Sequence, residues 1–404
     1  MRVIVVGAGA AGVFAAIRAR QLDPALQVDV LESAAHPLGK VRISGGGRCN
    51  VTHGCYDLNR LLQHYPRGHK QLRPVLSRFG PKDTVEWFER RGVALKTEAD
   101  GRIFPVSDRS ETIVDCLLRQ AERASVRILT GIGVTAVARD AGGFSVRTRA
   151  GCFRGDRLLL ATGSAPKGYR WAAGLGHTVV QPVPSLFTFT VSDPRLTGLA
   201  GVCVESARAT LEVHPPISAE GPVLITHWGL SGPAILRLSA WGARELHQLG
   251  YRAPLLVDWL PELSQEELRR HLFGLKRDCR KAVKGAPSLL PRRLWCSLAT
   301  AEGVDRERTW GEVSDRILNR LSESLKRCRL EVLGKGIFKE EFVTAGGVPL
   351  DEVHLESMES RRTPGVYLAG EILNVDGLTG GFNFQNAWAT GWVAGTALGG
   401  QTGV

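Results

Sequence analysis

The sequence predicts an α/β protein in which a Rossmann-like domain is assembled from both ends of the chain. Residues 2–6 (RVIVV) form an apolar, β-branched run that leads directly into a glycine-rich turn and a helix-like segment. A second glycine-rich block stands at residues 370–383. Between these blocks the pattern changes first to short strands and then to helices. We therefore expect the Rossmann-like domain at residues 1–190 and 335–404, an inserted β module at residues 191–260 and a helical module at residues 261–334.

The first 32 residues carry the βαβ fingerprint of a dinucleotide-binding site. A buried parallel strand is followed by GAGAAG at residues 7–12, a helix, and a second apolar run that stops at Glu32. Gly7 permits the tight turn, Gly9 lets the backbone approach a pyrophosphate, and Gly12 lets helix and strand pack closely. We expect the diphosphate at the helix N-terminus, beside Ala11, and a ribose hydroxyl on the Glu32 carboxylate. These residues alone leave FAD and NAD open.

A glycine loop follows at residues 39–53 (GKVRISGGGRCNVTH). Successive glycines let a backbone lie flat against a ligand with its N–H groups free to donate. The cations of the loop complement phosphate or an anionic flavin. We expect this loop to contact the cofactor through Lys40, Gly45, Gly46, Gly47, Arg48 and Asn50.

Cys49, in the same loop, is the first candidate for a catalytic proton donor. A thiol is soft and weakly acidic, and here it would face a flavin ring or a substrate. A buried structural thiol explains Cys49 equally well.

The next segment predicts a hairpin, a helix and a small antiparallel meander. Residues 96–108 indicate a hairpin around Asp100-Gly101, and Ser107 is expected to cap a helix over residues 108–124. Short strands follow, and the last of them ends in Ala161-Thr162-Gly163. In this region we expect Val134, Thr162 and Gly163 to approach the cofactor.

The inserted part carries a second catalytic candidate and a cluster of positive charge. His227, within THWGLSGPA at residues 226–234, either donates a proton or holds the insertion against the cofactor domain. Residues 269–293 hold nine basic residues against one acid, which favours a phosphate-backbone partner, although a solvated helix face explains them equally well. A first basic stretch spans residues 60–82. We expect nucleic-acid contacts from Arg269, Arg270, Lys276, Arg277, Arg280, Lys281 and Lys284.

The C-terminal segment returns to nucleotide chemistry. Residues 365–371 (GVYLAGE) indicate a strand, and a glycine-rich turn then leads into a small-residue helix at residues 387–398. A glycine-rich turn at a helix N-terminus is suited to an anion or a flavin edge. We expect cofactor contacts from Gly370, Glu371, Asp376, Gly380, Gly381, Phe382 and Asn383.

The amino-acid composition limits the partners and the cellular compartment that we expect for the protein. The 404 residues carry 52 Lys and Arg against 40 Asp and Glu, a net charge of +12, which indicates either a polyanionic partner or a general effect on solubility. The eight cysteines form no C-x-x-C pair, so we expect free thiols in a reducing compartment and no metal. Because no signal peptide or membrane-spanning run is evident, we expect a cytoplasmic protein with no membrane partner. The oligomeric state is left open.

Taken together, these motifs resemble the YhiN/BaiN-like family of FAD-dependent oxidoreductases. The resemblance spans nearly the whole chain, and its specific parts are SGGGRCN at residues 44–50 and the block ending in TGGFN at residues 379–383. It implies an FAD domain of the two-dinucleotide-binding type, split by a β-barrel-like module and a helical module. Residues 164–169 depart from the family pattern, because many relatives carry a longer Pro/Gly-rich stretch there.

The resemblance also implies what the protein does. Members of the family are similar to a ribosomal RNA dihydrouridine synthase, to enzymes of bile-acid double-bond reduction and to an aminoacetone oxidase. We therefore expect an FAD enzyme with NAD(P)H as electron donor that reduces a uridine C=C bond in large-subunit ribosomal RNA. A small-molecule oxidoreductase is the first alternative, and a non-catalytic flavin- and RNA-binding protein is the second.

Overall fold

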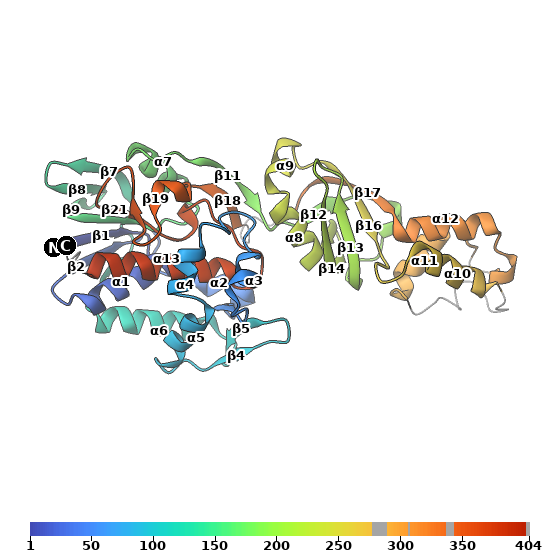
Figure 1. The fold of residues 1–404 in the computed structure, drawn as a ribbon, viewed down its shortest axis with the longest axis horizontal. Coiled ribbons are helices and arrows are strands. Elements are labelled where there is room, and N and C mark those ends of the chain that lie inside the picture. Colours follow the sequence, from blue (N-terminus) through green and yellow to red (C-terminus); the bar gives the residue numbers. More distant parts are fainter. Residues whose placement is uncertain (277–288, 306–307, 337–342, 401–404) are drawn as a thin grey trace. The chain divides into compact units, whose positions relative to one another are not determined.

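The computed structural model describes residues 1–276, 289–305, 308–336 and 343–400. Contacts between Cα atoms divide the chain into two compact units. Unit 1 comprises residues 1–182 and 344–404, and unit 2 comprises residues 183–343. Unit 1 thus combines the two ends of the chain, coloured blue and red in Figure 1.

A seven-stranded sheet forms the centre of unit 1. Five parallel strands are extended at one edge by two antiparallel ones. The order across the sheet is β19 (Val353–His354), β20 (Glu359–Ser360), β21 (Val366–Leu368), β10 (Arg157–Leu160), β1 (Arg2–Val6), β2 (Gln27–Leu31) and β6 (Arg127–Leu129). The apolar residues of β1 are buried on both faces, as is typical of a covered parallel sheet.

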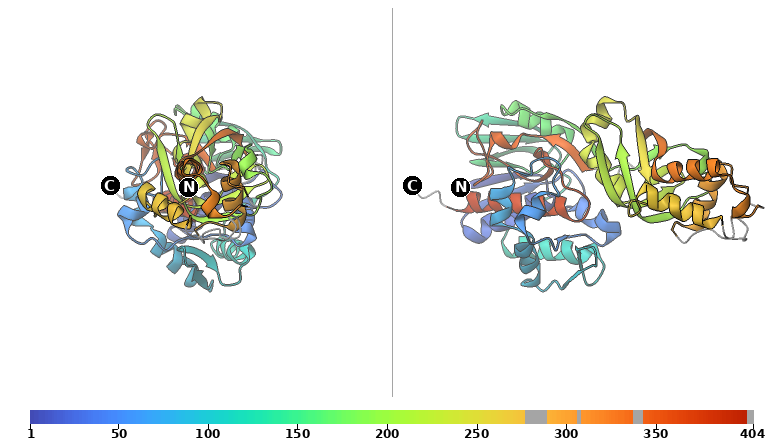
Figure 2. Two further views of the ribbon diagram at one scale, coloured as in Figure 1. Left: turned by 90° about the vertical axis from the view of Figure 1, so that its right-hand side faces the viewer. Right: turned by 45° about the vertical axis from the view of Figure 1, so that its right-hand side comes forward.

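Helices cover one face of this sheet, and a meander covers the other (Figures 1 and 2). The helices are α1 (Ala10–Leu22), α6 (Ser110–Arg123) and α13 (Phe382–Gly399). The meander consists of β7 (Val134–Asp140), β8 (Gly143–Thr148) and β9 (Gly151–Gly155), with helix α7 (Pro166–Gly174) beside it.

The first and last helices of unit 1 pack against each other with almost no space between them. A Cβ atom at Gly391, Gly395 or Gly399 of α13 would lie 2.7, 2.4 or 2.3 Å from the carbonyl oxygen of Ala11, Ala15 or Ala19, respectively. Both sets recur every four residues, which places each on one helix face. The sequence therefore specifies a close helix pair by keeping one side free of side chains.

The remaining elements of unit 1 are short and lie on the connections. They are α2 (Gly39–Gly47), β3 (Thr52–His53), α3 (Leu58–Leu62), α4 (Arg73–Arg78), α5 (Pro81–Glu89), β4 (Leu95–Thr97), β5 (Arg102–Pro105), η3 (Leu350–Glu352) and η4 (Gly370–Ile372). Strands β3, β5 and β4 form a small sheet. A separate two-stranded sheet pairs β11 (Val180–Ser185) with β18 (Val343–Gly347).

Unit 2 contains a closed six-stranded barrel. Its strand order is β12 (Phe189–Val191), β15 (Gly229–Ser231), β14 (Ile217–Thr226), β13 (Cys203–Leu211), β16 (Ala253–Asp258) and β17 (Cys328–Lys335). Gly229 is required for closure, because a Cβ there would lie 2.3 Å from the carbonyl oxygen of Phe189 on the neighbouring strand. This contact gives THWGLSGPA a structural role.

Helices complete unit 2 around buried tryptophans. They are α8 (Pro233–Trp241), α9 (Ala243–Gln248), α10 (Gln265–Leu275), α11 (Arg292–Ala301) and α12 (Asp315–Lys326), with the short turns η1 (Pro194–Leu196) and η2 (Trp310–Glu312). Trp259, Trp295 and Trp310 are fully buried among them. Every helix of the described ranges is too short or too polar to cross a lipid bilayer.

The predicted α/β class, the Rossmann domain and the barrel-like and helical insertions are confirmed. Three local predictions need correction. The C-terminal helix was expected at residues 387–398, but α13 begins five residues earlier, at Phe382. Residues 328–334 were assigned to the helical module, but they belong to β17, whose alternating buried and exposed residues complete the barrel. Ser107 does not cap α6, because its Oγ bonds Thr112 Oγ1 at 2.6 Å and the helix begins three residues later, at Ser110.

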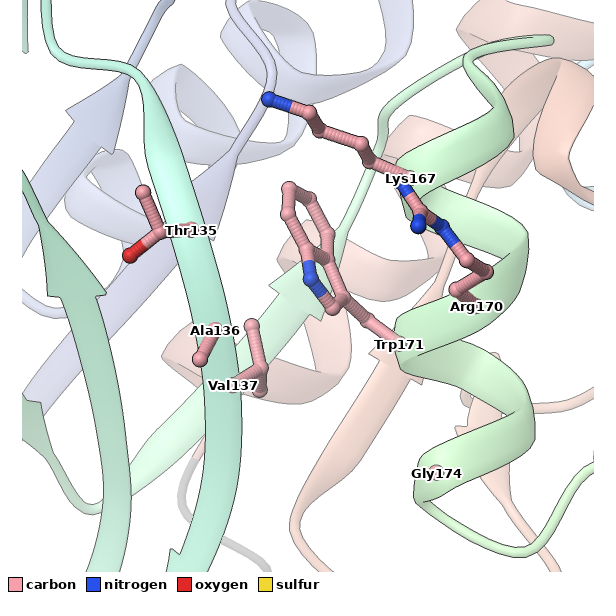
Figure 3. A pocket seen from close by; sticks show the side chains of 7 residues that line it. All are labelled: Thr135, Ala136, Val137, Lys167, Arg170, Trp171 and Gly174. Atoms are coloured by element: carbon pink, nitrogen blue, oxygen red, sulfur yellow. The ribbon is translucent and has the colours of Figure 1, made fainter.

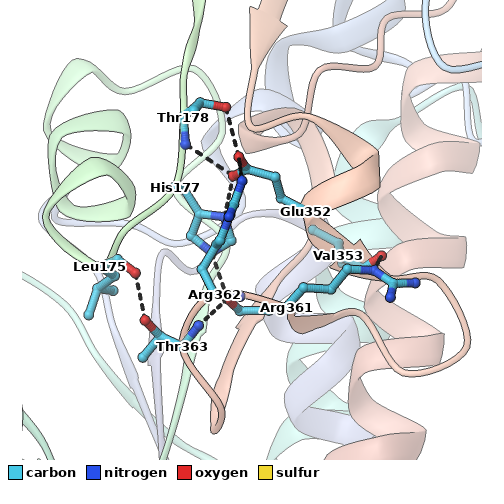
Figure 4. A network of polar contacts seen from close by, with 9 residues as sticks. Leu175, His177, Thr178, Glu352, Val353, Arg361, Arg362 and Thr363 are labelled. Atoms are coloured by element: carbon cyan, nitrogen blue, oxygen red, sulfur yellow. Dashed lines mark hydrogen bonds and ion pairs between the residues drawn. The ribbon is translucent and has the colours of Figure 1, made fainter.

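A buried polar network fastens the segment after α7 to the edge strands of unit 1 (Figure 4). His177 Nδ1 lies 2.9 Å from Glu352 Oε2, and His177 Nε2 lies 2.8 Å from Ser360 Oγ. Glu352 also accepts hydrogen bonds from Thr178 and Arg362. The three residues His177, Glu352 and Ser360 are buried, so this Ser-His-Glu arrangement is a fastening and not an accessible nucleophile.

The network makes unit 1 sensitive to acid. Burial lowers the pKa of His177 below 6.5 and keeps it neutral. Burial alone would raise the pKa of Glu352, but the hydrogen bonds from Arg362, Thr178 and His177 together hold it below 4.5. Both groups therefore contribute stability at neutral pH that is lost on acidification, His177 below its unfolded pKa and Glu352 as the pH falls through its folded pKa.

We expect Glu352→Ala to lower the melting temperature by roughly 2–10 °C at pH 7.5, because it leaves buried donors unpaired. Circular dichroism should show this difference shrink as the pH falls from 6.5 to below 4.5. The matched control is Glu356→Ala, an exposed carboxylate in the same connection, which should melt like the wild type at every pH. A constant difference between the Glu352 variant and the wild type across this range would contradict the assignment.

Candidate active site

The turn from β1 into α1 forms an open cradle at a helix N-terminus. Gly7 has φ +106°, and a Cβ there would lie 2.4 Å from the carbonyl oxygen of Ala161. A Cβ at Gly12 would lie 2.1 Å from the carbonyl oxygen of Gly7. Gly9 differs from both, because a Cβ at Gly9 would meet no atom within 4 Å. Gly7 and Gly12 thus serve the fold, whereas Gly9 keeps space free beside the first N–H groups of α1.

Glu32 lies at the same edge of the sheet, directly after β2. Its carboxylate accepts hydrogen bonds from the backbone N–H groups of Ala8 and Ala34, each at 2.9 Å. Ala8 belongs to the glycine turn, so the carboxylate stands beside the cradle. This is the place that the fingerprint assigns to the acid that binds a ribose hydroxyl.

The three-glycine loop ends α2 with a left-handed turn. Gly45, Gly46 and Gly47 have φ of +58°, +66° and +81°. A Cβ at Gly45 would press on Asn50 N and the Phe104 ring, at 3.0 and 3.1 Å, whereas a Cβ at Gly46 or Gly47 would stand in open space. Gly45 therefore packs the loop, and its two neighbours leave one backbone surface free for a ligand.

Cys49 is fully buried at the end of this loop. Its backbone N–H donates to Ser44 O at 3.0 Å, and its own φ of +60° is unusual for a residue other than glycine. Burial raises the pKa of the Cys49 thiol to about 12, although a hydrogen bond with Ser44 opposes the shift. The group is therefore a protonated thiol at neutral pH, able to donate a proton but not to act as a thiolate.

Asn50 joins the glycine loop to the C-terminal block. With its amide oriented to satisfy both neighbours, its oxygen accepts from Gly381 N at 2.9 Å and its nitrogen donates to Thr52 O at 2.9 Å. Gly381 is the residue before α13, so this amide sets the start of that helix.

Two of the three cations of the loop, Lys40 and Arg48, are neutralised by acids. Arg48 donates to Glu98 at 2.7 Å and lies 4.0 Å over the Phe104 ring, and the Glu98 hydrogen bond raises the pKa of Arg48. Lys40 forms an ion pair with Glu371 and bonds Ser164 Oγ at 3.2 Å. This contact brings three segments that are distant in the sequence to one edge of the site, beside Gly163. They are the segments that carry Lys40, Ser164 and Glu371.

The remaining cofactor candidates lie on the neighbouring strands and turns. Val134 is buried at the start of β7, and Thr162 follows β10 with its Oγ1 buried and without a partner among the described residues. Gly370 has φ +78° and lies against Ala11, since a Cβ there would be 3.0 Å from the Ala11 Cβ. The ends of β10 and β21 therefore meet the fingerprint helix.

Asp376, Phe382 and Asn383 hold the C-terminal turn together. Both carboxylate oxygens of the fully buried Asp376 bind Arg67. Asn383 bonds both the N–H and the carbonyl of Gly377 at 2.8 Å. The buried Phe382 ring stacks on His64 and His53, with centroids 4.1 and 4.7 Å apart. The side chains of Asp376 and Asn383 are thus engaged within the turn that carries Gly380 and Gly381.

Sequence reasoning did not find the polar network beneath this turn. Gln385 Oε1 accepts from Thr52 at 2.6 Å and from Thr84 at 2.8 Å, while its Nε2 donates to Phe79 O. All three side chains are buried. A lone Thr or Gln carries no recognisable pattern, so only the fold reveals that they fix α13 under the glycine loop.

The candidate residues of unit 2 are the proposed proton donor His227 and the proposed nucleic-acid contacts, and they lie on separate elements. His227 lies exposed at the turn between β14 and β15. Arg269 and Arg270 are exposed on α10, whereas Lys276 forms an ion pair with Asp315. Arg277, Arg280, Lys281 and Lys284 lie outside the described residues.

The residues of unit 1 fit an adenine dinucleotide. The free space at Gly9, the acid after β2 and the open backbone of Gly46 and Gly47 are the features that such a ligand requires. The fold and the site define an FAD-dependent oxidoreductase. The chain belongs to the HI0933-like family, because the model of the HI0933-like protein Rossmann domain matches residues 1–397. The predicted family resemblance is thereby confirmed.

Two characterised relatives are similar over nearly their whole length. A 3-dehydro-bile acid delta(4,6)-reductase of Clostridium scindens is 32% identical over 98% of both chains. A ribosomal RNA dihydrouridine synthase of Escherichia coli is 30% identical over 96% of both chains. Among solved structures, the 3-ketosteroid-delta4-(5alpha)-dehydrogenase of Rhodococcus jostii RHA1 aligns with a TM-score of 0.51 at 15% identity, covering 99% of this chain and 96% of that one. This last likeness is one of fold.

We expect Gly9→Val to fold normally but to lose FAD, because the added side chain enters ligand space and its Cβ meets no protein atom within 4 Å. Absorbance near 450 nm of the purified protein, with the released flavin identified as FAD, measures occupancy. Gly142→Val, at an exposed glycine that also has free space, should keep full occupancy. Gly12→Val should fail to fold because of its 2.1 Å clash. A fully loaded Gly9→Val protein would contradict the placement of the diphosphate.

We also expect Cys49 to resist alkylation in the native protein, since it is fully buried and its thiol has a pKa of about 12. Iodoacetamide at pH 8 followed by peptide mass spectrometry should modify the exposed Cys152 and leave Cys49 unmodified until the protein is denatured. Labelling of Cys49 at the rate of Cys152 would show that the thiol is accessible or ionised, against this assignment.

Proposed function

We propose that this protein is an NAD(P)H-dependent reductase that converts a uridine of large-subunit ribosomal RNA to dihydrouridine. The observation that carries the proposal is the 30% identity, over 96% of both chains, to a ribosomal RNA dihydrouridine synthase. The net charge of +12 supports it, since a strongly basic protein attracts a polyanion. The exposed Arg269 and Arg270 on α10 add to this basic character.

The reaction adds two hydrogens across the C5–C6 bond. NAD(P)H gives up a hydride and becomes NAD(P)⁺, one carbon of the uracil ring receives a hydride, and the other carbon receives a proton. FAD, when bound, supplies the hydride to the ring. The glycine turn, Glu32 and the three-glycine loop would hold the cofactor in place.

Cys49 is our proposed source of the proton. Its thiol is protonated at neutral pH, because burial raises its pKa to about 12. Such a weak acid releases its proton only to a strongly basic acceptor. The acceptor is the ring carbon next to the one that has received the hydride, because that neighbouring carbon then carries the negative charge. The buried thiol would therefore keep its proton until the uracil ring has received the hydride. His227, on the turn between β14 and β15 of unit 2, remains the second candidate.

A small-molecule reductase is the second candidate function. It is favoured by the 32% identity to a 3-dehydro-bile acid delta(4,6)-reductase, which spans 98% of both chains. This candidate would use the same cofactor site and the same proton donor, but it leaves the basic surface unexplained. We further propose a cytoplasmic location, which the free state of the seven described cysteines supports.

We expect large-subunit ribosomal RNA from a strain lacking this gene to be short of one dihydrouridine, as measured by mass spectrometry of RNA digests. Wild-type protein with NAD(P)H should restore the modification to that RNA in vitro. Cys49→Ala should bind FAD fully but restore it about 10²–10⁴-fold more slowly, the usual scale for losing a general acid. Cys152→Ala, at an exposed thiol, should be as fast as the wild type. Unchanged RNA in the deletion strain would refute the RNA proposal and favour the small-molecule candidate.

A further inference from the structure

A pocket opens between the first meander strand and the helix that follows the cofactor edge (Figure 3). It has a volume of about 280 Å³ and is formed by β7 and α7, both in unit 1. Trp171 projects from α7 toward Thr135 and Val137 on β7. Lys167 and Arg170 stand on the same helix and also line the pocket. The pocket thus joins one aromatic ring to two cations.

Neither cation is paired with another residue that the structure describes. Both Lys167 and Arg170 are exposed, and neither has a hydrogen bond or ion pair with any described residue. This contrasts with Lys40 and Arg48, whose charges are neutralised by Glu371 and Glu98. The two charges beside Trp171 are therefore available to an external anion.

The positive charge extends beyond the pocket onto the meander. Residues 134–174 contain seven Lys and Arg against two Asp and Glu. Four of these arginines are exposed on the meander, and none of the four has a side-chain partner in the described ranges: Arg139, Arg147, Arg149 and Arg154. One of the two acids, Asp156, accepts a hydrogen bond from the Arg2 backbone at 2.6 Å. A single small anion would leave this wider surface unused.

An aromatic face flanked by unpaired cations is the arrangement that holds single-stranded nucleic acid. Bases stack on aromatic rings whatever their sequence, and Lys or Arg neutralise the phosphates that connect them. We propose that a nucleotide of the RNA substrate binds in this pocket, with its base stacked on Trp171 and its phosphate against Lys167 and Arg170. This inference rests on the proposed function and assigns a part of the RNA contact to unit 1.

The pocket is well placed for an enzyme that acts on one base of a strand. Helix α7 begins two residues after Ser164, whose Oγ bonds Lys40 Nζ at 3.2 Å at the edge of the cofactor site. Gly168 of α7 packs directly on Thr162, since a Cβ there would lie 1.9 Å from Thr162 Oγ1. A strand held in the pocket would therefore contact the helix that itself packs on Thr162, one of the residues expected at the cofactor.

The test uses the FAD-loaded full chain and a fluorescein-labelled oligouridylate of about twelve nucleotides, a length suited to single-strand sites. Trp171→Ala should weaken binding by about 5- to 100-fold, the range for one stacked base. The double variant Lys167→Glu and Arg170→Glu should weaken it further at low salt. It should also reduce the slope of log affinity against log salt by about 1.4, the loss of two phosphate contacts on a single strand.

Matched controls remove the general effects of charge and of exposed tryptophan. Arg119→Glu with Arg123→Glu makes the same change in net charge on α6, on the opposite face of the sheet (Figure 1). Trp241→Ala removes an exposed tryptophan of α8, which does not line the pocket. Both controls should bind the oligonucleotide within about threefold of the wild type, and full FAD content should verify that every variant is folded.

The outcomes separate this inference from the proposed function. If the wild type binds and the pocket variants bind equally well, or lose no more than the charge control, the pocket assignment is overturned while the RNA function stands. If the pocket variants instead raise the apparent dissociation constant for NADPH and leave oligonucleotide binding unchanged, the pocket holds the electron donor and the RNA assignment is overturned. If the wild type does not bind the oligonucleotide at low salt, both fail.

Discussion

The contact between α1 and α13 is the constraint on which unit 1 depends. Three glycines of α13 place its backbone against three alanine carbonyls of α1, and any larger side chain on that face would separate the helices. One helix carries the nucleotide fingerprint at its start, and the other begins at the second glycine-rich turn. Holding the two in register therefore brings the two ends of the chain to a single ligand site.

Further contacts transmit this constraint to the loop that holds Cys49. Trp388 of α13 donates its indole N–H to Val51 O at 2.9 Å, and Gln385 receives the hydroxyls of Thr52 and Thr84. Phe14 of α1 packs against Trp388 with ring centroids 5.3 Å apart. The buried thiol is thus held by a rigid support drawn from both helices, which is compatible with the proton-donor role that we propose for Cys49.

Local chemistry made part of this architecture predictable. Gly7 and Gly12 each do what only glycine can do, and a strand, turn, helix and strand around them leave few alternatives. The hairpin around Gly101 follows from turn chemistry in the same way, and β4 and β5 form it. The prediction that Ser107 caps α6 was wrong because the hydroxyl of Ser107 bonds Thr112 instead, and capping rules do not consider such a competing side chain.

Contacts between residues far apart in the chain could not be predicted from the sequence. Arg67 belongs to the basic stretch at residues 60–82, which suggested a surface for a polyanion. Its charge is instead neutralised by Asp376, 309 residues away. Lys40 and Arg48 likewise find acids that only the fold brings near. Conversely, we assigned no role to Lys167 or Arg170 from the sequence, yet the structure leaves both without an ion pair in the described ranges, beside Trp171. Positive residues can be counted in a sequence, but the sequence does not show which of them are left unpaired and able to bind an external anion.

The interleaved order of the chain has a consequence for how the protein is made. During synthesis on the ribosome, β1, α1 and β2 emerge first, while β21 and α13, which complete the sheet and cover α1, emerge after the whole of unit 2. Until then the alanine face of α1 has no partner, and the cofactor cradle lacks the turn that closes it. We therefore expect the flavin to be captured firmly only once translation has passed α13, so that cofactor loading follows the synthesis of unit 2.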